Sequence, residues 1–363
     1  MMFKYFMLLI GVVFALPRYS LQEATSCMSC HVNPTGSGMR NDYGSNIYSL
    51  EELPLERYVS SGDEDWDGYI NDNIQIGGDF RIQAFKDGNE TKLFPMQADI
   101  YANVDVNKKA NLYFKVDISR HLSDEYFVLL KDVFQNTWMK VGQSLPNYGI
   151  RLDDHTSFTR GGNINSIFSD DYAEYDEGLF FDISNEPPVL IEFGTKFNNL
   201  YLTFGMADNF ITDESVDGFV NFSSSINSYY QLDDLSISTG LSVMKESDIK
   251  SYSFFGGFSV EKLSFLFEVD KVENWIQDLD SFATMLQMTY EPIQGLHLLA
   301  KYDYFDRNYD ISSGTVGRKT LGFELYPLNI LEIDFQIRQY ELENLTTEGT
   351  EDTEFLIQVH SWF

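Results

Sequence analysis

The segment from Ile74 to Ala84 reads IQIGGDFRIQA, and apolar and polar side chains alternate along its length. The positions expected on the apolar face are Ile74, Ile76, Gly78, Phe80, Ile82 and Ala84. The positions expected on the polar face are Gln75, Asp79, Arg81 and Gln83. A period of two is typical of a β-strand with one apolar and one polar face. Strands of this kind, about ten residues long, are what a lipid-facing barrel with a wet lumen requires.

The alternation recurs in segment after segment as far as the C-terminus. In the next segment the apolar face is expected to carry Met96, Ala98, Ile100, Ala102, Val104 and Val106. Strands are expected to begin near residues 73, 93, 111, 125, 137, 188, 200, 218, 234, 250, 263, 281, 296, 316, 330 and 353. Short turns and longer connections alternate between them, which gives every strand a direction. A strand at 178–184 would break the even count, so we place that segment in a loop.

The sequence therefore predicts an all-β fold, a transmembrane outer-membrane β-barrel of about 16 antiparallel strands, over residues 73–363. One connection, from Pro146 to Pro188, is far longer than an ordinary loop and is expected to be functional. It is the third outer loop. We expect it to fold into the lumen, as in general porins, with an exposed surface loop as the alternative.

The first residues indicate export. Lys4 precedes an apolar stretch from Phe6 to Leu16, which is too short to span a bilayer but suits a secretory signal peptide. Ala15 and Ala24 are both plausible cleavage points, and we assign residues 1–24 to the signal peptide.

The last residues give an independent indication of the outer membrane. Apolar positions recur by twos back from Phe363, so the final strand ends on an aromatic carboxyl-terminal residue. This ending resembles the signature by which the outer-membrane assembly machinery recognises its clients. We therefore expect the chain to contact that machinery and the outer-membrane lipid of a Gram-negative bacterium.

The formal net charge of -31 restricts the class of partner. Such an acidic chain repels nucleic acid and other anionic surfaces, so nucleic acid is not expected to bind. Small cations are the favoured ligands, and a metal cation is the expected substrate. The alternative is that the charge serves solubility and self-repulsion of exposed loops.

Both cysteines of the chain lie in the motif Cys27-Met28-Ser29-Cys30-His31. In C-x-x-C-H the two thiols can form thioethers to a haem, and the adjacent imidazole can bind the iron as the proximal ligand. The sequence thus predicts one haem c. A disulfide, a thioredoxin-like redox pair and half of a zinc site are the alternatives; no βαβ pattern supports the redox pair, and no second cysteine pair supports zinc.

Met39 is the first candidate for the sixth ligand of the haem iron. Gly36, Gly38 and Gly44 lie around it and would let the backbone pack closely against a macrocycle, or they form a simple linker. Residues 25–72 are therefore expected to form a haem-binding segment followed by an acidic linker.

The linker contains the first half of a calcium-binding pattern. Asp63, Asp65 and Asp67 alternate before a glycine, and Asn71 follows. Ile74 occupies the position where the closing acidic ligand is expected. A calcium ion is a candidate cofactor here, and a solvated acidic linker is the alternative.

The arrangement of one N-terminal C-x-x-C-H motif and a 16-strand barrel resembles the fused cytochrome-porins, outer-membrane proteins known as iron oxidases. The resemblance is one of architecture, and residues 27–31 carry the shared motif. It implies electron transfer from an extracellular donor such as ferrous iron, through the haem, to a periplasmic redox protein. The segment 33–44 does not reproduce the pattern after the haem motif in that family, which bears on the iron substrate.

Two competing functions remain at the level of the sequence. One is a passive diffusion porin whose haem-bearing segment is structural, and the other is an outer-membrane protein with a disulfide and no haem. Porins of this size commonly assemble as trimers, so a homotrimer is an expected state.

Overall fold

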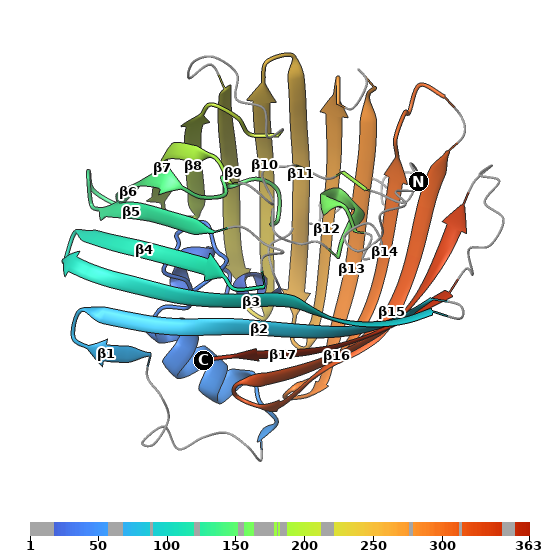
Figure 1. Ribbon diagram of the computed structural model, residues 1–363, viewed down its shortest axis with the longest axis horizontal. Coiled ribbons are helices and arrows are strands. Elements are labelled where there is room, and N and C mark those ends of the chain that lie inside the picture. The colour runs from blue at the N-terminus through green and yellow to red at the C-terminus, as the bar shows by residue number, and fades with distance from the viewer. Residues whose placement is uncertain are drawn as a thin grey trace, which may run out of the picture.

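The computed structural model describes residues 18–56, 68–87, 90–119, 124–151, 156–162, 178–179, 181, 187–211, 221–275, 279–311, 314–342 and 353–363. Within these ranges, sixteen antiparallel strands form a closed barrel, in which each strand pairs with the next and β17 returns to pair with β2 (Figure 1). The strands are β2 (Ile74–Asp87), β3 (Glu90–Asn107), β4 (Ala110–Asp117), β5 (Glu125–Lys131), β6 (Thr137–Gln143), β7 (Val189–Phe197), β8 (Leu200–Ala207), β9 (Asn221–Leu232), β10 (Leu235–Glu246), β11 (Ile249–Val260), β12 (Leu263–Glu273), β13 (Ser281–Ile293), β14 (Leu296–Asp306), β15 (Thr315–Leu328), β16 (Leu331–Leu342) and β17 (Thr353–Trp362). An additional short strand, β1 (Tyr69–Asn71), pairs with the start of β2.

The predicted fold class is confirmed. Each of the sixteen barrel strands begins within three residues of its expected start. Gly178, Leu179 and Phe181, the described part of the segment placed in a loop, lie outside any strand.

Side chains alternate between lipid and lumen along the strands. On β17, Phe355, Ile357 and Val359 are exposed on the outer surface, whereas Leu356 and His360, at the alternate positions, are buried inside. A closed barrel satisfies every backbone hydrogen bond between strands, and its apolar exterior suits the hydrocarbon core of a bilayer.

One predicted orientation is wrong. Met96 was expected on the lipid face, but it is buried and receives a hydrogen bond from Gln83 Nε2 at its Sδ atom, at 2.9 Å. The register between β2 and β3 shifts at this point, because Gln97 pairs with Arg81 while Pro95 pairs with Ile82. Met96 is therefore the extra residue of a β-bulge beside a proline, and a bulge reverses the alternation.

The N-terminal residues 18–56, blue in Figure 1, pack against the inner wall and one rim of the barrel, and we call them the plug. The plug contains α1 (Arg18–Gln22), a short 3-10 turn η1 (Cys27–Ser29) and a π-helical segment η2 (Gly44–Glu52). No helix in the described ranges is long and apolar enough to cross a membrane. Between β6 and β7, the short helix η4 (Phe158–Arg160) belongs to the connection that was predicted to enter the lumen.

Candidate functional site

The plug is held by the inner wall of the barrel on several sides. Leu21 is fully buried against β11 and β12, where it packs with Phe255 and Leu266. Tyr201 of β8 donates a hydrogen bond to the carbonyl of Pro34, at 2.7 Å. The short turns between strands mark the periplasmic end of such a barrel. Near one of them, between β15 and β16, the Leu55 amide donates to the carbonyl of Tyr326, at 2.9 Å. The haem motif therefore lies within the lumen.

The motif folds into a single turn that starts at Cys27. The amides of Cys30 and His31 both donate to the Cys27 carbonyl, at 3.1 and 3.0 Å. His31 then forms an antiparallel bridge with Arg40, and the Val32 amide donates to the carbonyl of Met39, at 3.0 Å. The turn and the following hairpin thus hold two thiols and one imidazole on a short, hydrogen-bonded frame.

Asn41 and Gly44 fix this frame from the other side. The Asn41 amide donates to the Cys30 carbonyl at 2.9 Å, and its side-chain Nδ2 donates to the carbonyls of Met28 and Ser29, at 3.2 and 3.1 Å. A Cβ atom at Gly44 would lie 2.2 Å from the Cys30 carbonyl oxygen, so only glycine permits this approach. The glycine-rich segment therefore packs against the motif rather than acting as a simple linker.

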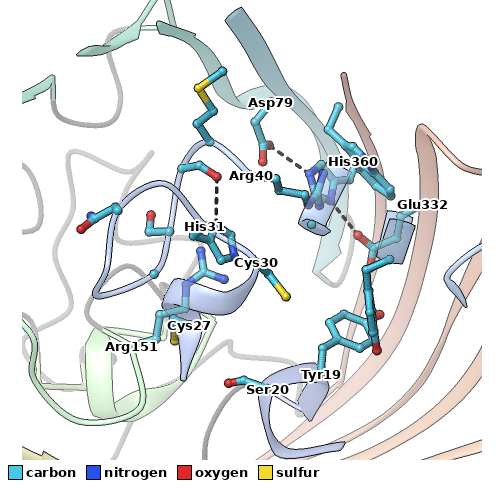
Figure 2. Close-up of a pocket in the computed structure, with 18 of the residues that line it drawn as sticks. Tyr19, Ser20, Cys27, Cys30, His31, Arg40, Asp79, Arg151, Glu332 and His360 are labelled. Carbon is cyan, nitrogen blue, oxygen red and sulfur yellow. Dashed lines mark hydrogen bonds and ion pairs between the residues drawn. The ribbon is translucent and has the colours of Figure 1, made fainter. Parts of the chain in front are cut away.

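Cys27, Cys30 and His31 all line one lumenal cavity of about 410 Å³ (Figure 2). Its volume is within the range of about 300–1,000 Å³ that is usual for small-molecule and cofactor sites. Charged side chains on its wall include Arg40, Asp79, Arg81, Arg151, Glu332 and His360. His360 lies between two carboxylates, with Nε2 3.0 Å from Asp79 and Nδ1 2.6 Å from Glu332, so both its nitrogens are engaged.

The two cysteines are free thiols. Burial raises the pKa of Cys27 to about 11, and it also raises the pKa of Cys30. A redox-active pair needs surroundings that lower the thiol pKa, so the thioredoxin-like alternative is disfavoured. Among the residues that the structure describes, no group of three or more His, Cys, Asp or Glu side chains is placed to hold a metal ion. The zinc alternative therefore has no further ligands in these ranges.

His31 is oriented by its neighbour on the hairpin. Its Nδ1 atom lies 3.3 Å from the Gly38 carbonyl oxygen. An imidazole that donates from Nδ1 to a carbonyl keeps its Nε2 lone pair for a metal, as metal-binding histidines usually do. This geometry suits the role of proximal ligand.

Met39 lines the same cavity as Cys27, Cys30 and His31. Residues that are adjacent along a strand point to opposite faces, so the Met39 side chain is directed away from the face that carries Arg40 and His31. Met39 is buried in an aromatic cluster with Tyr101, Tyr113, Phe127, Leu129, Trp138, Tyr201 and Tyr229. Its role as a ligand stays a prediction, and its contacts favour a packing role.

A second cavity, of about 840 Å³, lies between the plug and the periplasmic turns. Met28 and His31 line it on the plug side, and exposed residues of the turns, including Lys131, Lys196 and Asn198, line it on the barrel side. His31 is therefore shared by the two cavities. The motif is reached from the periplasmic end through this second cavity.

We call the connection between β6 and β7 loop 3, and its described residues 144–151 and 156–162 pack against the inner wall of the barrel, as the predicted inward fold requires. Arg160 lies between Glu268 and Asp270, and both carboxylates bind its guanidinium. Although burial opposes the charge, these two carboxylates raise the pKa of Arg160 above its ordinary value. Arg318 of β15, three strands further round the wall, donates to the carbonyls of Thr156 and Gly162. Loop 3 is therefore anchored to the lumen by buried charges.

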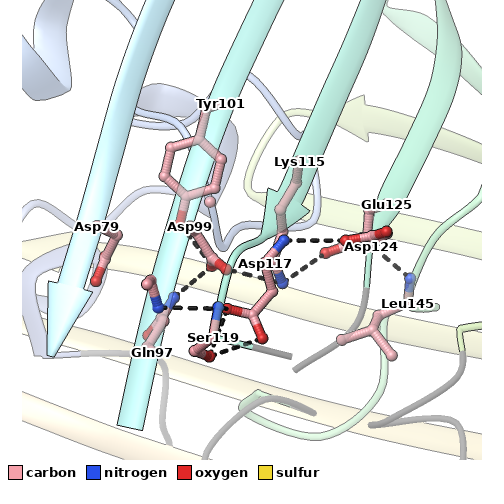
Figure 3. Close-up of polar contacts among 12 residues, drawn as sticks. Asp79, Gln97, Asp99, Tyr101, Lys115, Asp117, Ser119, Asp124, Glu125 and Leu145 are labelled. Carbon is pink, nitrogen blue, oxygen red and sulfur yellow. Dashed lines mark hydrogen bonds and ion pairs between the residues drawn. The ribbon is translucent and has the colours of Figure 1, made fainter. Parts of the chain in front are cut away.

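Two buried lysines connect the barrel wall with the plug and with loop 3. Lys140 of β6 forms an ion pair with Glu192 of β7 at 2.8 Å, and it donates to Thr35 of the plug and to the carbonyl of Leu145 in loop 3, at 3.1 and 3.2 Å. Lys115 lies between Asp99 and Glu125, at 3.8 and 3.5 Å, in the polar network of Figure 3.

The same network reaches loop 3 through Glu125. Its Oε2 atom accepts from the Ser144 hydroxyl and the Leu145 amide, at 2.8 and 3.2 Å. Plug, wall and loop 3 thus share one set of polar contacts. No pattern in the sequence predicts this set of contacts, because its members are far apart along the chain.

The structure describes only one of the four predicted calcium ligands, Asn71. Asp63, Asp65 and Asp67 lie outside the described residues. Asn71 is in β1, and its side-chain oxygen accepts a hydrogen bond from the Asn73 amide at 2.9 Å. The calcium site remains a prediction.

The donor set fits a c-type haem. Two thiols at the C-x-x-C spacing and an imidazole oriented through Nδ1 line one enclosed space, and that space has the size of a cofactor site. Cys27 and Cys30 would hold the group and His31 would bind its iron.

No protein-family model and no curated protein matches the sequence. Among solved structures, the barrel is similar to OmpT, an outer membrane protein of Vibrio cholerae, with a TM-score of 0.56 and 12% identity over 80% of this chain and 99% of that one. It is similar to Salmonella typhi OmpF in complex with daunomycin, with a TM-score of 0.54 and 13% identity over 81% and 99%. It is also similar to the outer membrane channel DcaP of Acinetobacter baumannii, with a TM-score of 0.56 and 11% identity over 82% and 99%. The fold is therefore porin-like, in agreement with the predicted location in the outer membrane.

Proposed function

We propose that this chain is an outer-membrane protein of the porin fold whose residues 27–31 hold a covalent haem c inside the lumen, so that electrons pass from an extracellular donor to a periplasmic redox protein. Ferrous iron is the first donor to test. The observation that carries the proposal is that Cys27, Cys30 and His31 line one cavity enclosed by the barrel. A barrel has an apolar band about 25 Å tall, so a haem near its periplasmic end would need a donor that enters the lumen.

Each residue of the site has a defined role. Cys27 and Cys30 attach the group through thioether bonds, and His31 binds its iron through Nε2 because the Gly38 carbonyl engages Nδ1. A haem c bound there supplies one-electron chemistry. The formal net charge of -31 attracts cations toward the protein. The periplasmic cavity gives a partner protein access to the His31 side of the motif.

Expression in a host with c-type cytochrome maturation tests the proposal. The outer-membrane fraction should contain a haem-stained band on a denaturing gel and a sharp c-type reduced-minus-oxidised spectrum. Replacement of Cys27 and Cys30 by alanine should abolish the stain, whereas Ser29→Ala, which keeps the motif, should retain it. A wild-type barrel without covalent haem would contradict the proposal, and failure of ferrous iron to reduce a haem that is present would exclude iron as the donor.

A passive diffusion porin is the second candidate, and the fold similarity to porins and channels favours it. In that case residues 18–56 would have only a structural role. Solute uptake by proteoliposomes separates the candidates, since rapid uptake of small sugars supports the porin and negligible uptake supports a filled lumen. A homotrimer is expected for either candidate and can be checked by light scattering of the purified protein.

A further inference from the structure

The periplasmic rim of the barrel has a basic half and an acidic half. The turns β3–β4, β5–β6 and β7–β8, with the strand ends beside them, carry the charged residues Lys108, Lys109, Lys131, Asp132 and Lys196. The turns β9–β10, β11–β12 and β13–β14, with their strand ends, carry Asp233, Asp234, Glu261, Lys262 and Glu291. Because the whole chain has 56 acidic and 25 basic residues, four lysines on three neighbouring turns are a local reversal of its charge. We call Lys108, Lys109, Lys131 and Lys196 the basic rim.

The main chain holds the lysines of the basic rim at fixed positions. The Lys131 amide donates to the carbonyl of Lys109 at 2.8 Å, and the Lys196 amide donates to the carbonyl of Asn136 in the β5–β6 turn at 3.1 Å. The three turns are thus joined to one another. All four lysines are exposed, and within the described part of the chain none of their ammonium groups forms an ion pair.

Lys131 and Lys196 face the mouth of the lumen. Both line the second cavity, of about 840 Å³. On β5, Lys131 continues the row of Phe127 and Leu129, which are buried inside, and on β7, Lys196 continues the row of buried Glu192. Lipid lies on the other face of these strands. The two charges are therefore presented to a ligand that approaches the lumen from the periplasm.

Two carboxylates of the second cavity are engaged by other side chains. Asp42 accepts a hydrogen bond from the Tyr69 hydroxyl at 2.6 Å, and Asp105 accepts from the side-chain amide of Asn111. Among the described residues, neither carboxylate forms an ion pair with a lysine of the basic rim. The lysines thus remain available to an external anion.

We propose that the basic rim docks an acidic face of the periplasmic redox protein over the second cavity. The inference rests on the proposed function. The net charge of -31 repels an acidic partner from the chain as a whole, so the basic rim determines the orientation in which such a partner can approach. A partner seated there lies over the cavity that Met28 and His31 line on the plug side. The acidic half of the rim opposes docking on the other side of the opening.

Binding of a fluorescently labelled decaglutamate peptide to the purified full chain in a non-ionic detergent, followed by fluorescence anisotropy, tests this. The affinity should fall severalfold between about 0.01 and 0.15 M salt, because the Debye length shortens from about 30 Å to about 8 Å. The double variant Lys131→Glu with Lys196→Glu should bind roughly tenfold more weakly, since each reversal replaces an attraction by a repulsion. Lys262→Glu reverses an exposed lysine on the acidic half of the rim and should leave the affinity nearly unchanged.

The test separates the docking surface from the proposed function, because peptide binding requires no haem. A haem-free protein that binds the peptide through Lys131 and Lys196 would support the surface while the proposed electron transfer fails. Equal affinities of the wild type and the double variant, or an equal loss in Lys262→Glu, would overturn the inference. Binding to phosphatidylglycerol micelles without binding of the peptide would assign the lysines to lipid headgroups and overturn it as well. If the double variant does not fold, Lys131→Gln and Lys196→Gln decide, because unchanged affinity in both contradicts the docking surface.

Discussion

Lys140 and Glu192 form an ion pair at 2.8 Å in which neither side chain is exposed to solvent. The pair lies where the plug meets loop 3, because Lys140 also donates to Thr35, and Glu192 accepts from the Asn147 amide at 2.9 Å. It therefore links the two segments that fill the lumen. The predictions below concern this link, the plug and the residues of the haem motif.

Removal of one member of the pair should destabilise the barrel. Glu192→Ala leaves the Lys140 charge buried without its carboxylate, which typically costs about 3–5 kcal/mol. The folded band on semi-native gels should disappear at a lower temperature than in the wild type. The double variant Lys140→Met with Glu192→Met removes both charges and should lose less stability than Glu192→Ala. Equal melting of Glu192→Ala and the wild type would refute this account of the pair.

Deletion of residues 18–56 should open the lumen. Barrels of 16 to 18 strands leave an aqueous channel unless something fills them. We expect the single-channel conductance in planar bilayers to rise severalfold in the deletion variant. Ser replacement of both Cys27 and Cys30 keeps the plug and serves as the control, with conductance close to that of the wild type. A deletion variant with unaltered conductance would show that another segment sets the pore size.

Met39→Leu should leave the haem spectrum and reduction potential unchanged. The exchange nearly conserves volume, so the aromatic cluster around residue 39 should lose less than about 1.5 kcal/mol of stability. Spectra of both oxidation states check this directly. If Met39 is the sixth ligand, as the sequence suggested, the leucine variant will instead change the ferric spectrum and lower the potential.

The thiols of haem-free protein should react slowly with iodoacetamide. The pKa of Cys27 is raised to about 11, so the reactive thiolate is scarce at pH 8 and the rate should rise roughly tenfold per pH unit until the pH nears that pKa. A Cys30→Ser background isolates Cys27, and the denatured chain supplies the control with an ordinary thiol pKa of about 8.5. A rate at Cys27 that levels off near pH 8.5 would contradict the burial.

The mature chain should begin before Arg18. Leu21 is fully buried against the barrel wall, and Arg18 forms an ion pair with Glu324, so α1 belongs to the folded protein. These contacts favour cleavage after Ala15 over the assigned boundary at residue 24. The intact mass of protein from the outer membrane distinguishes the two. A mass that corresponds to a start at Thr25 would show that α1 is removed.

The strands could be predicted from the sequence because alternation is a local property. About ten residues of a segment are enough to identify its apolar and its polar face, and the short turns give the direction of the strand. Local rules failed at Met96, where a bulge moved one side chain from the lipid to the lumen. The proline beside it was the available signal, since proline within a strand often accompanies a bulge.

The location of the haem motif could not be predicted in the same way. The spacing of Cys27, Cys30 and His31 identifies the chemistry, but contacts such as Leu21 with Phe255 and Pro34 with Tyr201 join residues that are far apart along the chain. Ion pairs inside the lumen, such as Lys140 with Glu192, were missed for a related reason, since a sequence pattern cannot show which charges are paired.

The pairing of β17 with β2 has a consequence for biogenesis. β17 closes the ring by pairing with β2, and the main chain of Phe363 exchanges hydrogen bonds with Gly78, at 3.1 and 3.2 Å. The cysteines of the plug lie within that ring, so the closed barrel would block an enzyme that attaches haem from Cys27 and Cys30. We therefore expect attachment to take place on the exported chain in the periplasm, with the barrel closing afterwards around an already loaded segment.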